Sequence, residues 1–164
     1  MRTAYIPLII LPIWLGSCLG TARISDLPKT ADEINFDAYS KKPMKKSGGI
    51  WTFKTTTEYY LEIPAALSQD SLMDILIEAL RTRKYARIDP PAYEGSRITA
   101  THGATMNEWA YVTGIYYRLS PGKVQLYIRT KITQDITGGA KNNLSEKLGE
   151  VIASLIGKLA PHNS

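Results

Sequence analysis

The chain has 164 residues, of which 44% are hydrophobic and 21% charged, a composition typical of one globular domain. This composition excludes collagen-like, wholly disordered and multi-span membrane proteins. The formal net charge of +5, from 20 basic and 15 acidic residues, is too small and too dispersed to indicate a nucleic-acid-binding protein. One cysteine and two histidines exclude a disulfide framework, a zinc site of four Cys and His ligands, and an iron–sulfur cluster.

The first 18 residues have the layout of a secretory signal peptide. Arg2 supplies a positive start, residues 4–15 form an uncharged run, and two small residues precede Cys18. The run is shorter than the roughly 20 apolar residues that cross a bilayer as a helix, and two prolines interrupt it. We therefore expect residues 1–17 to be a cleaved signal peptide rather than a permanent transmembrane anchor.

The four residues Leu15-Gly16-Ser17-Cys18 resemble the lipobox of bacterial lipoproteins, which has a branched apolar residue, two small residues and a cysteine. The resemblance implies that Cys18 is diacylated and becomes the first residue of the mature chain. Leu19 follows, and it is not the aspartate that tends to retain lipoproteins in the inner membrane of diderm bacteria. The resemblance thus implies an outer-membrane location facing the periplasm if the source is a diderm bacterium. The alternative is an incidental thiol beside an ordinary cleavage site.

Residues 18–49 have no helical or strand periodicity and contain scattered prolines and glycines, which predicts a lipidated, flexible tether. Such a tether would let the domain lie on the order of tens of ångströms from the anchor. Its apolar residues able to dock back onto the domain are Ile24, Leu27, Ile34 and Phe36. Its basic cluster consists of Lys41, Lys42, Lys45 and Lys46. We interpret this cluster either as a contact for anionic lipid head groups or cell-wall polymer, or as solvated linker residues.

A single domain is predicted over residues 50–164. Residues 50–63 alternate between apolar and polar side chains, as a half-buried strand does, and Pro64 ends the run. An amphipathic helix follows, from N-cap candidates at 68–71 to the basic stretch at 81–84. Two short strands are then predicted, at 85–88 and 95–101.

A β-hairpin is the clearest element of the second half. Its arms are residues 108–119 and 123–133, and Ser120-Pro121-Gly122 suits a tight turn. A closing helix with an apolar stripe is predicted over residues 144–159. Together these elements indicate an α+β fold in the order β-α-(β)-β-β-α, with an antiparallel sheet of three to five strands and two helices packed on one face.

Residues suited to catalysis are scarce. An acylated Cys18 cannot act as a nucleophile, so a serine-type arrangement would need one of the two histidines as its base. His162 lies near the end of the chain, which leaves His102, and an ordinary surface or turn histidine is the simpler interpretation of that residue. The sequence has no metal-binding, phosphate-binding or dinucleotide-binding motif. We therefore expect a protein that is not an enzyme and that needs no cofactor or metal.

One strand offers a candidate contact surface. The second hairpin arm alternates, and its polar face is predicted to carry Gln125, Tyr127, Arg129 and Lys131 in water. Such an aromatic and basic row suits cation–π and charge-assisted contacts with an acidic protein partner or an anionic glycolipid. The alternative is a solvated strand face whose tyrosine only satisfies β-propensity.

The plan of lipobox, linker, small sheet with a long hairpin and closing helix resembles that of small outer-membrane assembly lipoproteins, either LptE-like or with BamC-like helix-grip domains. The resemblance implies a non-enzymatic, lipid-anchored envelope protein that faces the periplasm and binds another envelope component, most simply a protein. The alternative function is that of a small-ligand or lipid carrier. A closed core would favour partner binding, and an apolar cavity of roughly several hundred Å³ between helices and sheet would favour the carrier.

Overall fold

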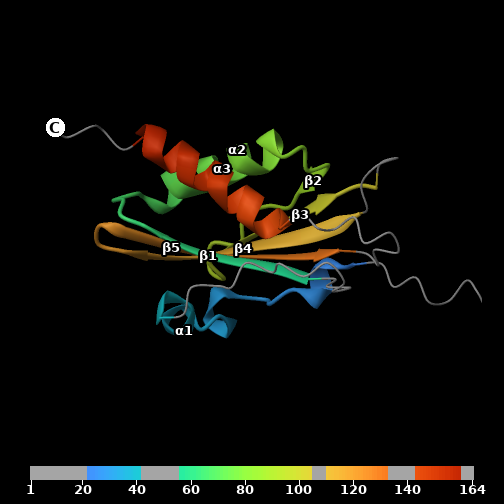
Figure 1. The fold of residues 1–164 in the computed structure, drawn as a ribbon, viewed down its shortest axis with the longest axis horizontal. Coiled ribbons are helices and arrows are strands. Elements are labelled where there is room, and N and C mark those ends of the chain that lie inside the picture. Colours follow the sequence, from blue (N-terminus) through green and yellow to red (C-terminus); the bar gives the residue numbers. More distant parts are fainter. Residues whose placement is uncertain (1–21, 42–55, 105–109, 133–142, 160–164) are drawn as a thin grey trace, which may run out of the picture.

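The described part of the chain comprises residues 22–41, 56–104, 110–132 and 143–159 of a computed structural model. Its centre is a five-stranded antiparallel sheet in the order β1-β5-β4-β3-β2 (Figure 1). The strands are β1 (Thr56–Ile63), β2 (Arg87–Ile88), β3 (Arg97–His102), β4 (Tyr111–Ser120) and β5 (Lys123–Ile132). The helices are α1 (Phe36–Lys41), α2 (Gln69–Thr82) and α3 (Leu144–Leu159), and two 3-10 turns, η1 (Ile24–Asp26) and η2 (Ala31–Glu33), precede α1.

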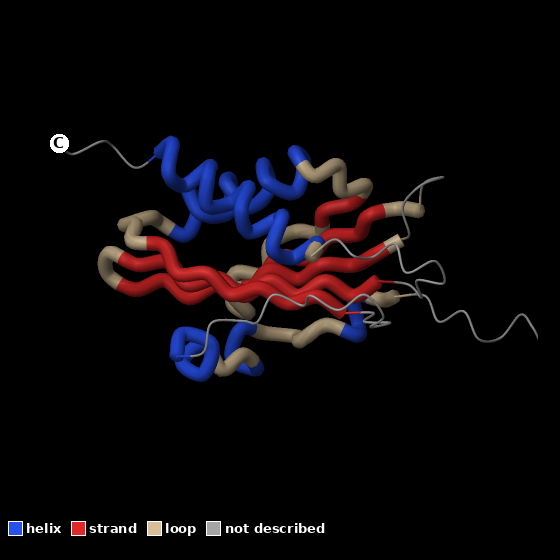
Figure 2. The backbone as a smooth tube through the Cα atoms, in the orientation of Figure 1, coloured by secondary structure: helices blue, strands red, loops and turns tan. Residues whose placement is uncertain are grey.

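The elements form three layers (Figure 2). Helices α2 and α3 lie on one face of the sheet, and residues 22–41 lie on the other. The predicted α+β fold, with two helices on one face of an antiparallel sheet, is therefore confirmed. The two short strands are present as β2 and β3. Residues 50–55 of the predicted first strand lie outside the described part.

The two ends of α2 show why this stretch folds as a helix. Ser68 caps the start, because its hydroxyl oxygen accepts a 3.1 Å hydrogen bond from a backbone N–H of the first turn. At the other end Lys84 takes a left-handed conformation with a φ of 59°. The Lys84 N–H donates to the Arg81 carbonyl at 2.8 Å. The Tyr85 N–H donates to the Leu80 carbonyl at 3.1 Å, which completes a Schellman motif and turns the chain back toward the sheet.

The predicted hairpin is present as β4 and β5, and residues 108–109 and 133 of its predicted arms lie outside the described part. Ser120 pairs with Lys123 across the turn, and Pro121 and Gly122 occupy its central positions. Gly122 has a φ of 73°, a conformation that favours glycine. Strand β1 pairs with β5 over its whole length rather than with a strand next to it in the chain. The first strand in the sequence, β1, is therefore held in the sheet by hydrogen bonds to the last strand, β5.

The larger apolar core lies between the two helices and the sheet. Side chains of α2, α3 and the central strands form one apolar core. Its fully buried members include Leu72, Leu76, Ile115, Leu126, Ile128 and Ile152. At Gly149 the backbone of α3 approaches the ring of Tyr59 on β1 closely.

A chain of hydroxyl groups crosses this core near one end of the sheet. Tyr85 Oη lies 2.7 Å from Thr113 Oγ1, which lies 2.8 Å from Thr130 Oγ1. Ser145, at the start of α3, continues the chain, with its Oγ 3.0 Å from Thr130 Oγ1 and 2.9 Å from Thr57 Oγ1. Thr113, Thr130 and Ser145 have no exposed surface. These hydrogen bonds satisfy polar groups that folding removes from water.

Residues 22–41 cross the second face of the sheet, and we call them the N-terminal strap. Phe36 keeps only 1% of its surface exposed there, and Leu27 and Ile34 are also buried. The carbonyl oxygen of Pro28 accepts a hydrogen bond of 2.7 Å from the Tyr116 hydroxyl on β4. The strap is thus held by both apolar burial and hydrogen bonding.

The prediction of a flexible tether over residues 18–49 is therefore wrong for residues 22–41. The strap buries isolated apolar side chains, namely Leu27 and Ile34, which are extended residues after the two 3-10 turns, and Phe36 at the start of α1, so they need no helical or strand period. The surface on which the strap docks is also formed by strands that come later in the chain, so the residues of the strap alone do not reveal it. Residues 18–21 and 42–49 lie outside the described part.

Candidate functional site

The row predicted on β5 is not an open surface. Tyr127 keeps 1% of its surface exposed and Gln125 keeps 5%, because the strap and the neighbouring strand β1 cover them. The prediction that Gln125, Tyr127, Arg129 and Lys131 form a row facing water is therefore wrong for Gln125 and Tyr127, whereas the side chains of Arg129 and Lys131 are each 34% exposed. The alternation along β5 separates the two faces correctly, but it does not reveal that both faces are covered.

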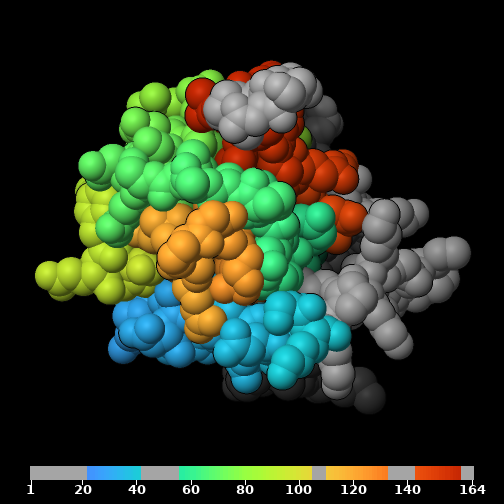
Figure 3. All heavy atoms as spheres, turned by 90° about the vertical axis from the view of Figure 1, so that its left-hand side faces the viewer, coloured from blue at the N-terminus to red at the C-terminus, as the bar shows by residue number. Residues whose placement is uncertain are grey.

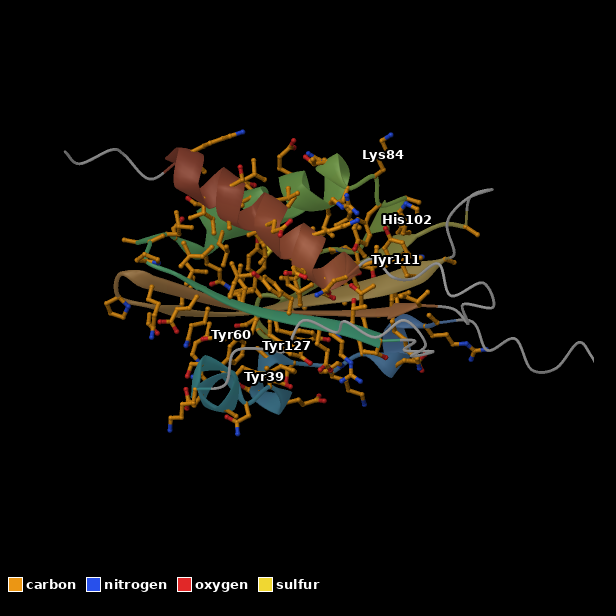
Figure 4. The ribbon with its side chains drawn as sticks, viewed as in Figure 1. Tyr39, Tyr60, Lys84, His102, Tyr111 and Tyr127 are labelled. Carbon is orange, nitrogen blue, oxygen red and sulfur yellow. The ribbon has the colours of Figure 1, made fainter. Side chains whose placement is uncertain are left out.

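Tyr127 lies at the centre of a second, aromatic core between the strap and the sheet. Its ring stacks on Tyr39 of α1 with the centroids 4.9 Å apart and lies 6.0 Å from the ring of Tyr116. Tyr39 also stacks on Tyr60 of β1, at 6.3 Å, and Phe36 meets Tyr60 edge-on. Figure 4 shows Tyr39, Tyr60 and Tyr127 together between α1 and the sheet. The tyrosines that suggested an interface from sequence instead hold the strap.

The two basic residues of the row pair within the chain. Lys131 Nζ lies 2.9 Å from the carboxylate of Asp26 in η1, and this hydrogen bond lowers the pKa of Asp26. Arg129 Nε lies 3.7 Å from the carboxylate of Glu58 on β1. Gln125 donates hydrogen bonds to side chains of β1. All four residues of the row therefore serve contacts within the sheet and the strap.

Burial raises the pKa of two tyrosines of this second core, Tyr116 and Tyr127. Loss of water around the Tyr116 hydroxyl raises its pKa to about 12. The same loss of water raises the pKa of Tyr127 above its ordinary value. Near neutral pH both groups are therefore packing and hydrogen-bonding groups rather than acids or bases.

The predicted anchor and most of the predicted lysine cluster lie outside the described residues. Cys18, Lys42, Lys45 and Lys46 belong to that part, and what we infer about them stays a prediction. Lys41 is the last residue of α1 and is exposed.

His102 is buried at the end of β3, so the expectation of a surface or turn histidine is wrong. It keeps 6% of its surface exposed, and its ring stacks on Tyr111 with centroids 4.5 Å and planes 5° apart (Figure 4). Tyr85 meets both rings edge-on. This aromatic packing favours a structural role over general-base catalysis. Among the described residues, no group of three His, Cys, Asp or Glu side chains is placed to hold a metal ion.

Two neighbouring pockets open where the β4–β5 hairpin turns, and we call the surface formed by their lining residues the hairpin end. The first has a volume of about 280 Å³, and its lining includes Asp32, Phe36, Gln69, Ser96, Arg118 and Leu119. The second has a volume of about 480 Å³ and is lined by Ala66, Leu67, Leu119, Ser120, Pro121 and Gly122. Figure 3 views this end, with the hairpin turn in orange between the strap in blue and the segment before α2 in green.

The polar groups of the first pocket are already oriented. Arg118 Nη1 lies 3.0 Å from the carboxylate of Asp37, and its guanidinium carbon lies 4.9 Å from the centre of the Phe36 ring. Gln69 Nε2 donates to the Tyr117 hydroxyl at 2.7 Å. The Arg118 side chain is 45% exposed. A guanidinium carries five N–H donors in a planar fork, so Arg118 can bind a further carboxylate or carbonyl oxygen.

Ser96 lines the first pocket and has a strained backbone. Its φ of 46° is uncommon for a residue other than glycine. In this conformation its N–H donates to the Tyr93 carbonyl at 3.1 Å, and its carbonyl accepts from the Tyr117 N–H at 3.0 Å. The strained residue thus fixes the start of β3 against β4 beside the pocket.

The hairpin end was not found by sequence reasoning. Its lining residues come from the strap, the start of α2, the start of β3 and the hairpin, and no motif links these segments. The only signal for it in the sequence is the Pro121-Gly122 turn, which places an apolar ring at the tip of a long hairpin.

No described helix is both long and apolar enough to cross a membrane.

The comparisons with known proteins do not assign this chain to a family. A scan against protein-family models finds no match, and a search of curated proteins finds none. Solved structures with some likeness include TTHA0849 from Thermus thermophilus, at 10% identity, and a START superfamily protein from Mycobacterium smegmatis, at 13%. Each comparison covers 64% of this chain and 99% of the other with a TM-score of 0.38, which is too low to carry an argument about function.

Proposed function

We propose that this protein is a lipid-anchored, non-enzymatic binding component of a bacterial envelope that contacts a protein partner through the hairpin end. The observation that carries this proposal is the pair of adjoining pockets, which share Leu119. One has an apolar lining, and the other holds Arg118 and Gln69. Protein interfaces combine these features, with an apolar anchor in a pocket and hydrogen-bonding groups around it.

The two pockets suggest what the partner presents. Leu67, Leu119 and Pro121 would pack around one apolar side chain in the second pocket. Arg118 would take a carboxylate or carbonyl oxygen in the first pocket. Exchanging the exposed ion pair between Arg118 and Asp37 for a partner's carboxylate costs little, because such pairs contribute at most about 1 kcal/mol. A partner segment with an apolar residue beside an acidic one fits both pockets.

The apolar core of buried side chains between the helices and the sheet favours surface binding over a carrier with an internal cavity. A carrier of the kind considered from sequence needs an apolar cavity between the helices and the sheet. In the described residues that space holds an apolar core of buried side chains, and the two pockets of the hairpin end open at its edge, where Leu67 and Leu119 pack against it. Native mass spectrometry of protein extracted from membranes distinguishes the two functions. A bound lipid at one copy per chain would support the carrier.

The lipid anchor belongs to the proposal and rests on Leu15-Gly16-Ser17-Cys18. Cys18→Ser should leave an unprocessed precursor in the bacterial host and prevent incorporation of radiolabelled fatty acid. Labelling that persists in this variant would contradict the anchor.

Site-specific photo-crosslinking tests the hairpin end. Ala66 is exposed and lines the second pocket, so a photoreactive phenylalanine derivative placed there should give one discrete protein adduct in intact cells. Ser154, exposed on α3, is the matched control and should give none. Ala66→Arg should lose complementation of a deletion strain, whereas Ser154→Arg should keep it. Full complementation by Ala66→Arg would reject the hairpin end as the binding surface.

A further inference from the structure

We propose that the end of the sheet opposite the hairpin end lies directly on the membrane and contacts anionic phospholipid head groups. The contact is made by four cations within seven residues, Arg81, Arg83, Lys84 and Arg87, which we call the basic end. This inference rests on the proposed acylation of Cys18 and adds to it a distance and an orientation.

The length of chain between the anchor and the domain limits the distance. The strap is held from Asp26 onward, where the carboxylate pairs with Lys131, through to the aromatic core at α1. Only residues 19–21 separate Cys18 from Ala22, the first described residue. Because an extended chain spans at most about 3.6 Å per residue, Cys18 lies within roughly 15 Å of Ala22. An anchor this short holds the folded domain against the bilayer.

The start of the strap, which is the part nearest to Cys18 in sequence, lies at the same end of the sheet as the four cations. The turn η1 contacts the strands β3 and β4. Arg87 lies opposite Thr101 near the end of β3. The Tyr85 hydroxyl reaches Thr113 near the start of β4, at 2.7 Å. Figure 4 shows Lys84 at this end of the molecule, and Figure 1 shows the hairpin turn at the other.

The charge of the basic end is not balanced within the described part of the chain. Arg87 pairs with Asp89 at 2.9 Å, but no described carboxylate lies within ion-pair distance of Arg81, Arg83 or Lys84. Glu78, one turn earlier on α2, is exposed. Uncompensated cations within a Debye length of an anionic leaflet are attracted to it. A lipid chain combined with a basic patch is also the usual pair of signals for stable membrane contact.

This orientation has a consequence for the proposed binding surface. The hairpin end lies at the opposite end of the same sheet (Figure 1). With the basic end on the head groups, the two pockets point away from the bilayer. A partner in the periplasm or at another membrane could then reach them.

Fluorescence in vesicles tests the orientation with the full-length lipidated protein. Cys18 is the only cysteine and is blocked by acylation, so Lys84→Cys or Lys158→Cys gives a single site for a donor dye. Lys158 is the matched control, an exposed lysine near the end of α3 on the side of the hairpin turn. The vesicles contain phosphatidylethanolamine and phosphatidylglycerol with an acceptor dye on the head groups. We expect energy transfer several-fold greater from Lys84→Cys than from Lys158→Cys, and equal transfer from both would overturn the proposal.

A second comparison tests the charges themselves. Adding Arg81→Gln and Arg83→Gln to the labelled Lys84→Cys protein should reduce its transfer to the value found in vesicles without phosphatidylglycerol. Adding Lys158→Gln should leave the transfer unchanged. Unaltered transfer in the doubly neutralised protein would overturn the head-group contact.

If the proposed acylation of Cys18 is wrong, the purified protein will carry no fatty acid on that residue, and this result is distinct from the energy-transfer outcomes. The full processed chain should then still sediment with vesicles containing phosphatidylglycerol and lose at least tenfold in binding when Arg81 and Arg83 are neutralised. No sedimentation with such vesicles would overturn the basic end as well.

Discussion

Gly149 of α3 lies against the ring of Tyr59 on β1 so closely that a Cβ built on the glycine would stand 2.5 Å from two ring atoms. Real Cβ atoms are not found at this distance from a ring carbon. The glycine therefore sets how near the closing helix comes to the sheet, and with it the depth of the core on that face.

Gly149→Ala should destabilise the fold by about 1–3 kcal/mol, because crowding of the Tyr59 ring outweighs a gain of up to about 1 kcal/mol in helix propensity. Urea unfolding followed by circular dichroism measures the change. Gly157, in the same helix, has nothing within 4 Å of its added Cβ. Gly157→Ala should therefore stabilise by about 0.5–1 kcal/mol, and the same sign for both variants would contradict the close approach.

Lys84→Gly should stabilise the protein by about 1 kcal/mol. The residue occupies the left-handed position of the Schellman motif that ends α2, with a φ of 59°, where glycine has no steric penalty. Thermal unfolding should show a rise of about 2–6 °C in the midpoint. Lys84→Ala removes the same charge but keeps the penalty, so a similar rise in that variant would assign the gain to charge instead.

Removal of the strap should destabilise the domain rather than leave it unchanged. A chain that begins at Lys46 lacks the buried Phe36 and exposes the ring of Tyr127. We expect its free energy of unfolding in urea to fall by at least about 2 kcal/mol relative to a chain that begins at Leu19, since burial of each large apolar side chain contributes about 1.5–3 kcal/mol before entropy is subtracted. Equal stability of the two chains would show that the strap contributes nothing.

Thr130→Val should destabilise by about 1–3 kcal/mol although the two side chains have nearly the same shape. The substitution leaves the hydroxyls of Thr113 and Ser145 without their shared partner inside a core that water does not reach. Thr101→Val, at a half-exposed position of β3, is the control and should stay within about 0.5 kcal/mol of the parent. Equal effects in urea unfolding would mean that the hydroxyl chain adds no stability.

The protein should lose stability as the pH rises from about 10 to about 12. Burial raises the pKa of Tyr116 from 10.0 to about 12, so the folded state holds this proton more tightly than the unfolded state does. The stability linked to the group is complete below a pH of about 10 and is lost as the pH passes through its folded pKa. Tyr116→Phe should start less stable, because the bond to Pro28 is lost, but should decline less steeply in urea midpoints over this pH range. An unchanged slope would contradict this origin.

Elements governed by neighbouring residues could be predicted from the sequence. The cap at Ser68 and the apolar spacing define α2, and the turn at Pro121-Gly122 defines the hairpin. Each of these signals acts within a few residues of the structure that it determines. The two-helix face of the sheet follows from them, because the apolar stripes of α2 and α3 have nowhere else to be buried.

The strap and the site depend on contacts between distant segments, which local patterns do not encode. Phe36 is buried by Tyr60 and by the guanidinium of Arg118, which come much later in the chain. Tyr127 lies on the polar face of an alternating strand, so its burial follows only once the strap is in place. The pockets at the hairpin end likewise combine segments that share no sequence motif.

The pairing of β1 with β5 sets when the chain can fold as well as how. Ile63 lies opposite Val124 and Thr56 lies opposite Lys131. The first strand of the sheet, β1, therefore cannot pair until the last strand, β5, has been synthesised. The strap cannot dock completely before then either, since part of its docking face is β5. Contacts of such long sequence separation form slowly. During synthesis β1 therefore has no strand to pair with until β5 has left the ribosome, so an edge of the sheet and the apolar residues of the strap stay exposed to other chains over that interval.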